Sequence, residues 1–211
     1  FSRPDGKSVV FFSTLDTLSG STSATVIVGV LNSDGSSDLG FFGSGFRSIA
    51  PSGDIFYKVT SAIELSGGGY LIAGLTSIGR RMLIRRDANL EVATGFGSGG
   101  IVSTGGPGTS AYESMAEDDL GRIYAVGWRN PNTRDRVIVE RFFGDGALDT
   151  SWGTSGMLEP YADARALSAE LVSSEGRLYL GTSSFANPIA DRRPDVLAIN
   201  LGSQALDPAF G

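Results

Sequence analysis

The chain contains neither cysteine nor histidine among its 211 residues. Their absence excludes disulfide bonds, thiolate nucleophiles, zinc sites of the usual kind, histidine-based triads and imidazole acid–base chemistry. No apolar run approaches the roughly 20 residues that a membrane-spanning helix needs, so the sequence predicts no membrane span. It predicts no cofactor either, and the lack of cysteine suits a cytosolic and an exported protein equally well.

Positive charge is also scarce. Seventeen lysine and arginine residues face 23 acidic residues, which gives a net charge of −6. This balance argues against nucleic acid as a partner, because proteins that bind nucleic acid carry a clustered basic surface. The chain is 41% hydrophobic, with a mean hydropathy of +0.04. A folded core is therefore expected, since disorder requires low hydrophobicity together with high net charge.

Glycine, by contrast, is abundant, with 30 residues at recurring positions. Four of them close similar segments that end in an aromatic residue and a glycine: SDLGFFG, LEVATGFG, LDTSWG and LDPAFG, ending at Gly43, Gly97, Gly153 and Gly211. The intervals between these glycines are 54, 56 and 58 residues. Self-similarity at such a period indicates stacked copies of one small structural unit.

The third copy shows the unit most clearly. Short runs rich in valine, isoleucine and aromatic residues, separated by Gly, Pro, Asn and Asp, predict four strands at 99–105, 112–119, 122–128 and 136–142. The second and fourth copies have the same order, whereas the first keeps only the last two strands. The connection between the second and third strands of each unit holds a glycine, typical of a hairpin turn. The sequence thus predicts fourteen strands.

The order of a DGK-type turn, two apolar strands and DG-x-LD-x-x-FG resembles the delta-60 repeat family of bacterial propeller-like proteins. PDGKSVVFF, GGYLIAG, GRIYAVG, GDGALDTSWG and QALDPAFG carry the match, which covers essentially the whole chain. Two copies depart from it: SSDLGFFG lacks the LD pair, and LEVATGFG has one extra residue. The resemblance implies β-propeller blades, no enzyme activity and no catalytic residues to transfer.

We therefore expect an all-β fold, a β-propeller of four-stranded antiparallel blades with about three and a half blades in this chain. The expected units are a partial blade at 1–43 and blades at 44–97, 98–153 and 154–211. The aromatic-glycine pairs are expected to pack between adjacent blades. The half-blade deficit predicts either a fragment of a larger propeller or two copies that close a seven-bladed ring.

The sequence begins inside a repeat and without methionine, so we expect a processed or truncated N-terminus and a secreted, periplasmic or cell-surface location. The connections between units and within the glycine hairpins are constant, whereas the other loops vary. Variable loops on a rigid scaffold usually carry recognition. The residues expected on such a recognition face, unless they are only solvated loop residues, are Arg80, Arg81, Trp128, Arg129, Arg134, Tyr161, Arg192 and Arg193.

Three further patterns carry less weight. GFGSGG at 95–100 matches the dinucleotide fingerprint, but a strand rather than a helix is expected after it. NSDGSSD at 32–38 resembles an acidic calcium loop, with Asp34 and Asp38 as the candidate ligands, but it has no distal glutamate. Paired carboxylates suited to glycoside hydrolysis could come from one acidic run, which contains Glu113, Glu117, Asp118 and Asp119.

The favoured function is a non-catalytic propeller scaffold for protein–protein contacts, with a protein partner or a second copy completing the propeller. The alternative is a glycan-binding propeller, in which Trp128 and Tyr161 stack against sugar rings. A carboxylate-based glycoside hydrolase is the third hypothesis.

Overall fold

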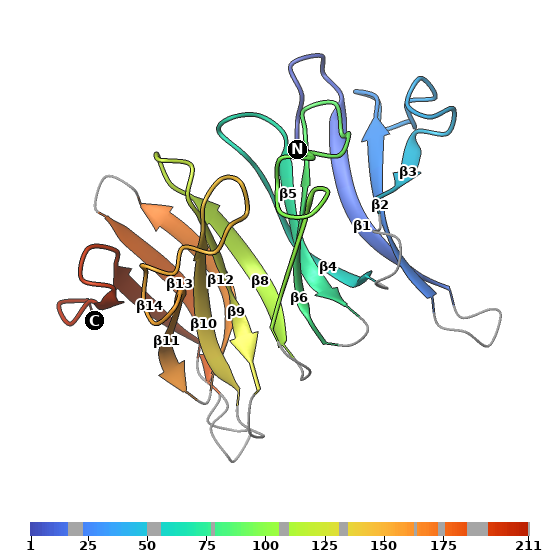
Figure 1. Cartoon of the computed structure of the whole chain (residues 1–211). Coiled ribbons are helices and arrows are strands. Elements are labelled where there is room, and N and C mark those ends of the chain that lie inside the picture. Colours follow the sequence, from blue (N-terminus) through green and yellow to red (C-terminus); the bar gives the residue numbers. More distant parts are fainter. Residues whose placement is uncertain are drawn as a thin grey trace.

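The computed structural model describes residues 1–16, 23–49, 56–76, 79–105, 110–130, 135–162, 164–172, 176–184 and 194–210. These residues form fifteen β-strands (Figure 1). None of them forms a helix, so no helix long and apolar enough to cross a membrane occurs among them. The prediction of an all-β fold is confirmed.

The strands form four antiparallel sheets. The first sheet contains β1 (Ser8–Asp16), β2 (Ser23–Leu31) and β3 (Phe46–Ser48). The second contains β4 (Phe56–Glu64), β5 (Tyr70–Thr76), β6 (Arg81–Arg86) and β7 (Ile101–Thr104). The third contains β8 (Ser110–Glu117), β9 (Ile123–Arg129), β10 (Arg136–Phe142) and β11 (Met157–Ala162). The fourth contains β12 (Ala164–Val172), β13 (Arg177–Ser184), β14 (Pro194–Asn200) and β15 (Ala205–Leu206).

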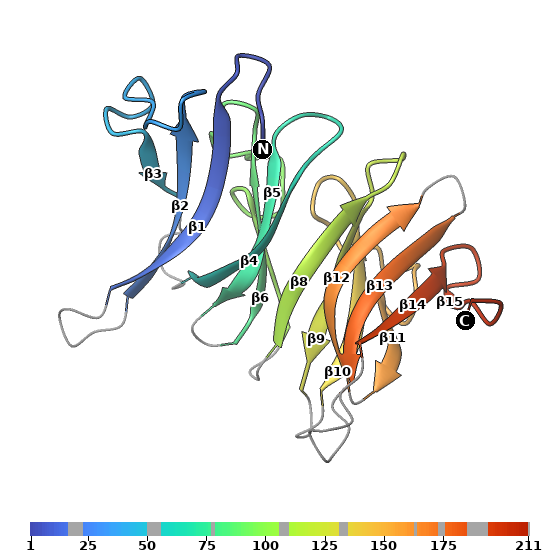
Figure 2. The same ribbon diagram turned by 180° about the vertical axis from the view of Figure 1, so that it is seen from behind.

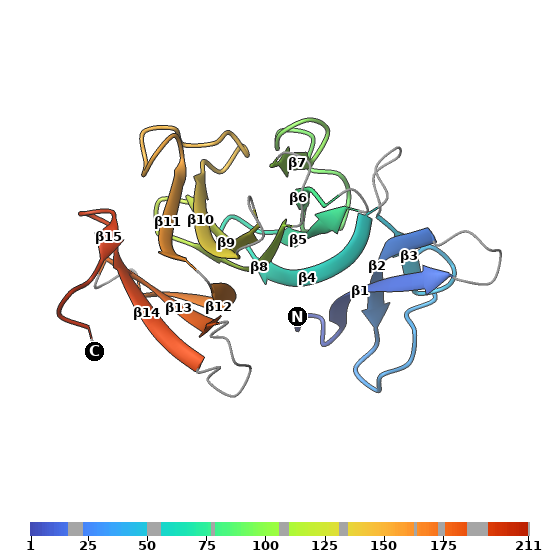
Figure 3. The ribbon, with the colours of Figure 1, turned by 90° about the horizontal axis from the view of Figure 1, so that it is seen from below.

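Each sheet follows the order of the chain, so neighbouring strands are joined as hairpins. The first strands of the second, third and fourth sheets, β4, β8 and β12, lie beside one another along one side of the array (Figures 2 and 3). Each of these three strands carries a register shift followed by a serine, at Ser61, Ser114 and Ser168. The second, third and fourth sheets therefore share this irregularity in their first strands.

The fourteen predicted strands are all present, but the predicted unit boundaries do not coincide with the sheets. The strand after each aromatic-glycine segment pairs back onto the strand before it, as β3 does with β2 and β7 with β6. Each of the first three aromatic-glycine segments is therefore the loop that connects two paired strands of one sheet. The predicted unit boundaries at Gly43, Gly97 and Gly153 consequently fall inside sheets. The count is also one strand short, because residues 205–206 form β15.

The predicted packing of the repeated aromatic residues between neighbouring sheets is confirmed for the second and third sheets. Phe96 is fully buried in the cluster that includes Leu83 of the second sheet and Ile138 of the third. Trp152 is fully buried between the third and fourth sheets, where its ring lies edge-on to Tyr124 at 5.6 Å between centroids. A hydrophobic seam of this kind joins each sheet to the next.

In the first copy the aromatic residue that packs against the seam is Phe41, which is partly buried, and not Phe42. The N–H of Gly45 donates to the carbonyl oxygen of Phe41 at 2.8 Å, as Gly100 does to Phe96. Phe42 therefore stands where the other copies have glycine, and its φ of 50° matches the 52° of Gly97. Such a left-handed conformation is costly for a side chain with a Cβ. Phe42 is 56% exposed, whereas Phe41 packs against the first seam.

Comparison of equivalent turns also shows that LEVATGFG contains no extra residue, contrary to the prediction from sequence. Leu90, with a φ of 68°, closes the turn after β6, and Gly146 closes the equivalent turn after β10. Ala93 then aligns with Asp149, because the N–H of each donates to a carbonyl oxygen of the preceding strand, Arg85 or Arg141. The second copy thus keeps the length of the repeat but replaces the aspartate of its LD pair with alanine.

The alternating strand directions give the array two different edges (Figure 1). We call one the turn edge, which carries the hairpin turns at 3–7, 65–69 and 118–122 and the aromatic-glycine segments. The opposite one is the loop edge, where β1, β5 and β9 end. Arg80 lies on the loop edge, just before β6.

Candidate functional site

Only part of the predicted recognition face can be placed. Arg134, Arg192 and Arg193 lie outside the described residues. Tyr161 lies in β11, where its backbone pairs with Val137, and its side chain is not among those described. Arg80 is exposed at the loop edge, and its backbone N–H donates to Thr76 Oγ1 at 3.1 Å. Arg80 is therefore exposed, as expected from the sequence.

The prediction that Arg81 lies on an exposed face is wrong. Arg81 is only 4% exposed, and its guanidinium donates two hydrogen bonds to Glu140 of the third sheet. The Nε–Oε2 distance is 3.2 Å and the Nη2–Oε1 distance is 3.0 Å. A buried charge requires such a partner, and Glu140 comes from β10, 59 residues further along the chain. Arg81 joins two sheets instead of presenting a charge to solvent.

Two hydroxyl groups complete this buried pair. The hydroxyl group of Tyr112 donates a hydrogen bond to Glu140 Oε2, and its oxygen lies 2.6 Å from Thr104 Oγ1. Burial, first of all, and the neighbouring Glu140 carboxylate raise the pKa of Tyr112 well above its ordinary value. Tyr112 therefore stays protonated at neutral pH and acts as a hydrogen-bond donor. The cluster holds the second and third sheets together through fully partnered polar groups.

Trp128 is also buried, with 6% of its residue exposed, so its expected role as a stacking platform for sugars is wrong. Its indole N–H donates to Glu113 Oε1 at 3.0 Å, across the pairing between β8 and β9. The strand β9 extends one residue beyond Trp128, to Arg129. Trp128 therefore lies within the strand, as the sequence predicts, but its side chain is not part of an exposed face.

Arg129 keeps part of its exposure but is already paired. Its guanidinium forms an ion pair with Glu159 of β11, which also lies 3.4 Å from Arg136. The side chain of Arg129 is 36% exposed. Glu159 thus ties together both arginines of the third sheet at the loop edge. A partner would meet Arg129 as one member of this three-residue group.

The acidic residues of the hydrolase hypothesis occupy separate environments. Glu113 accepts the Trp128 indole N–H, while Glu117 Oε2 accepts the backbone N–H of Ser66 in the second sheet at 2.6 Å. Asp118 is buried and caps the turn before β9, whereas Asp119 is exposed. Three of the four carboxylates are thus engaged by hydrogen bonds to different groups, which gives the hydrolase hypothesis no support.

The remaining motifs also form turns. GFGSGG closes the aromatic segment and runs directly into β7, with no helix to receive a phosphate. In the acidic loop, Asp34 accepts the N–H and hydroxyl of Ser36, and Asp38 accepts the Lys7 ammonium at 2.7 Å. Within the described residues, no three acidic side chains gather as metal ligands would.

Sequence reasoning missed a pair of charges that recurs in three sheets. An aspartate after the turn at the end of β2, β10 and β14 forms an ion pair within its own sheet: Asp38 with Lys7 at 2.7 Å, Asp149 with Arg141 at 2.6 Å, and Asp207 with Arg177 at 2.7 Å. The aspartate of the LD pair was the signal available in the sequence. The cation that pairs with the aspartate stands at the start of the preceding hairpin for Lys7 and Arg177 but in the adjacent strand for Arg141. Sequence spacing alone therefore does not identify the pair.

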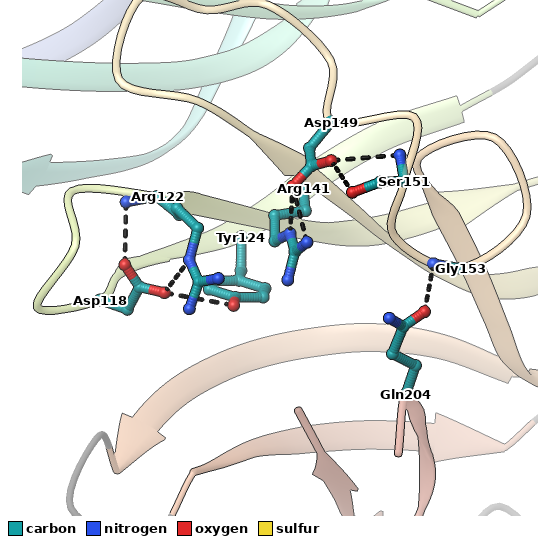
Figure 4. A network of polar contacts seen from close by, with 8 residues as sticks. All are labelled: Asp118, Arg122, Tyr124, Arg141, Asp149, Ser151, Gly153 and Gln204. Atoms are coloured by element: carbon teal, nitrogen blue, oxygen red, sulfur yellow. Dashed lines mark hydrogen bonds and ion pairs between the residues drawn. The ribbon is translucent and has the colours of Figure 1, made fainter. Parts of the chain in front are cut away.

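The third sheet shows the most complete version (Figure 4). Asp149 accepts Arg141 Nε at 2.9 Å and the hydroxyl of Ser151 at 2.6 Å. The Ser151 hydroxyl first, and then Arg141, lower the pKa of Asp149. The guanidinium of Arg141 lies 5.3 Å from the centre of the Trp152 ring, so the charge pair sits directly on the seam.

Beside it, Asp118 accepts Arg122 Nε at 2.6 Å and the Tyr124 hydroxyl at 3.2 Å (Figure 4). The seam continues into the fourth sheet, because the N–H of Gly153 donates to Gln204 Oε1 at 2.7 Å. Between the second and third sheets the same position is bridged by the N–H of Gly97 and the carbonyl oxygen of Asp145, at 2.8 Å. These polar contacts therefore belong to the framework that joins the sheets.

The second sheet departs from this pattern. Ala93 replaces the aspartate, and a cleft of about 520 Å³ lies at this place on the turn edge. Arg85, the equivalent of Arg141, lines the cleft together with Phe96, and no carboxylate of the described residues pairs with it. Its Nη1 donates to the carbonyl oxygen of Gly144 in the third sheet. The cleft is thus lined by an arginine without an acidic partner.

Comparison of the chain with models of known protein families gives no match, and comparison with curated protein sequences gives none either.

Proposed function

We propose that this chain is a non-catalytic β-propeller module of the delta-60 repeat type that acts as a scaffold for protein–protein contacts. The observation that carries the proposal is the use of its interior charges. At the seams Arg81 pairs with Glu140, and Arg141 pairs with Asp149, so each of these four buried charges has a partner of opposite sign. A site that holds its charges in this way supports a rigid framework rather than catalysis.

A radial arrangement accounts for the repeated seams. Four-stranded sheets that place their first strands side by side and their aromatic residues between neighbours are typical of propeller blades. Among the described residues the first sheet has three strands, and β2 is the one strand that pairs with β1. A further segment or a second copy would pair with this free edge. Two copies would then supply eight sheets, instead of the seven blades expected from two copies of fourteen strands.

Recognition is proposed for the loop edge, with Arg80 and the Arg129–Glu159–Arg136 group as its described part. The other hypotheses have less support, because Trp128 is buried and the acidic residues are separated. The proposed scaffold fits a secreted, periplasmic or cell-surface protein, where such repeat modules present their loops to other proteins.

Site-specific photo-crosslinking tests this proposal. A benzophenone amino acid replaces Arg80 on the loop edge or, as the matched control, Leu120 on the turn edge, which is 76% exposed. Illumination in cells that make the protein is expected to give a discrete protein adduct from position 80 and none from position 120. Adducts from position 120 alone, or from neither, would contradict recognition at the loop edge.

A further inference from the structure

We propose that the cleft beside Arg85 binds a carboxylate group, which takes the place that an aspartate side chain occupies in the other three sheets. The proposal concerns the turn edge and does not depend on the proposed scaffold function. It rests on the contrast between one sheet and its three structural copies.

The three copies define what the position binds. In each of them the backbone N–H two residues after the aspartate donates to that aspartate: Gly40 to Asp38 at 3.1 Å, Ser151 to Asp149 at 3.1 Å, and Ala209 to Asp207 at 2.9 Å. A lysine or arginine then pairs with the same carboxylate. One backbone N–H and one cation therefore form a carboxylate cradle in every sheet that has the aspartate.

The second sheet keeps this cradle without its carboxylate. Gly95 is the residue two after Ala93, and its N–H has no acceptor among the described residues. Arg85 lies over the Phe96 ring, with 6.0 Å from its guanidinium carbon to the ring centre, much as Arg141 lies over Trp152. Both Gly95 and Arg85 line the cleft. The two groups that bind an aspartate elsewhere are therefore open to a carboxylate from outside.

The surroundings select a singly charged group. Asp87 and Asp145 also line the cleft, and each is already occupied by backbone N–H groups, Asp87 by those of Asn89 and Glu91 and Asp145 by that of Ala147. Their negative charges disfavour a dianion such as phosphate more than a monocarboxylate. The contact with the Gly144 carbonyl oxygen uses one N–H of Arg85, and a guanidinium has five to give. The ligand class is a monocarboxylate.

Nuclear magnetic resonance of the isotope-labelled full chain, titrated with sodium acetate against sodium chloride at constant ionic strength, tests the proposal. The Gly95 amide and Arg85 Nε signals are expected to shift and saturate. Arg85→Gln is expected to raise the Kd for acetate by about tenfold or more, since it removes a charged hydrogen-bond donor. Arg3→Gln, an arginine of the first sheet's turn edge, is the control and leaves the Kd unchanged.

Ala93→Asp supplies a second variant that does not weaken the fold. It rebuilds the arrangement of the third sheet, so we expect it to abolish acetate binding while raising the midpoint of thermal unfolding. The proposal is overturned if the Gly95 amide does not respond, if Arg85→Gln binds acetate as the wild type does, or if Ala93→Asp retains full affinity.

The carboxylate could come from a small molecule or from an acidic side chain of a polypeptide. The blocked peptide acetyl-Gly-Glu-Gly-amide and its Gln counterpart distinguish these sources. Binding of the Glu peptide at the same signals and more tightly than acetate assigns the site to polypeptides, whereas weaker binding assigns it to small carboxylates. Equal binding of the Gln peptide would show that no carboxylate is recognised.

Discussion

Truncation of Trp152 is the most demanding test of the seams. The side chain is fully buried, lies edge-on to Tyr124 and supports the Arg141 guanidinium. Removal of a buried tryptophan side chain leaves a cavity and costs about 3–5 kcal/mol. Phe210, the copy of Trp152 in the fourth sheet, is 40% exposed and contacts the Tyr179 ring. Phe210→Ala should therefore cost less, about 1–2 kcal/mol.

Urea unfolding of Trp152→Ala, Phe210→Ala and the wild type measures the difference. The chain has two tryptophans, so Trp128 is the single indole reporter in Trp152→Ala and follows unfolding of the third sheet. Circular dichroism, measured in parallel, shows whether the sheets unfold together, because repeat arrays can lose cooperativity. Equal costs for the two variants, or a cost below about 1.5 kcal/mol for Trp152→Ala, would refute the argument that buried aromatic residues hold the sheets together.

Two further predictions concern the buried charges. Glu140→Gln leaves the Arg81 charge buried without a counterion and should lower the free energy of unfolding in urea by about 3–5 kcal/mol. The double variant Arg81→Met with Glu140→Leu should recover most of this lost stability, and a double variant as unstable as Glu140→Gln would contradict the prediction. The lowered pKa of Asp149 means that its contribution to stability is present above the unfolded pKa of about 3.9 and is lost as pH falls through the folded value. Urea midpoints measured across this acid range should therefore fall less steeply in Asp149→Asn than in the wild type, and identical slopes would show that the carboxylate is not coupled to folding.

The strands and the seam were predictable because both depend on local pattern. Apolar runs between glycine-rich turns specify the strands, and a large aromatic residue at a fixed place in each repeat indicates a shared buried position. The pairing of β3 and β7 with the preceding strands was not predictable in this way. A repeat period gives the length of the unit but not its phase, so it does not decide to which sheet the first strand of a unit belongs.

The candidate site was less predictable for a related reason. Arg81 stands at a strand end next to a variable loop, and nothing near it in sequence shows that Glu140 lies opposite in the next sheet. Trp128 is buried and donates a hydrogen bond to Glu113 across the strand pair, 15 residues away in the sequence. The cleft at Arg85 emerges only from comparison of structurally equivalent positions, because Leu90 conceals the correct alignment of the second copy.

Recognition is proposed for the loop edge, whereas the seams and interior charges serve the framework. The most direct measurement is the Kd of the partner captured by photo-crosslinking, determined for the wild type, Arg80→Glu and Arg3→Glu. These variants carry the same charge reversal on the loop edge and on the turn edge. We expect at least about a tenfold weaker Kd for Arg80→Glu and an unchanged Kd for Arg3→Glu. An unchanged Kd for Arg80→Glu together with a weakened one for Arg3→Glu would contradict this proposal.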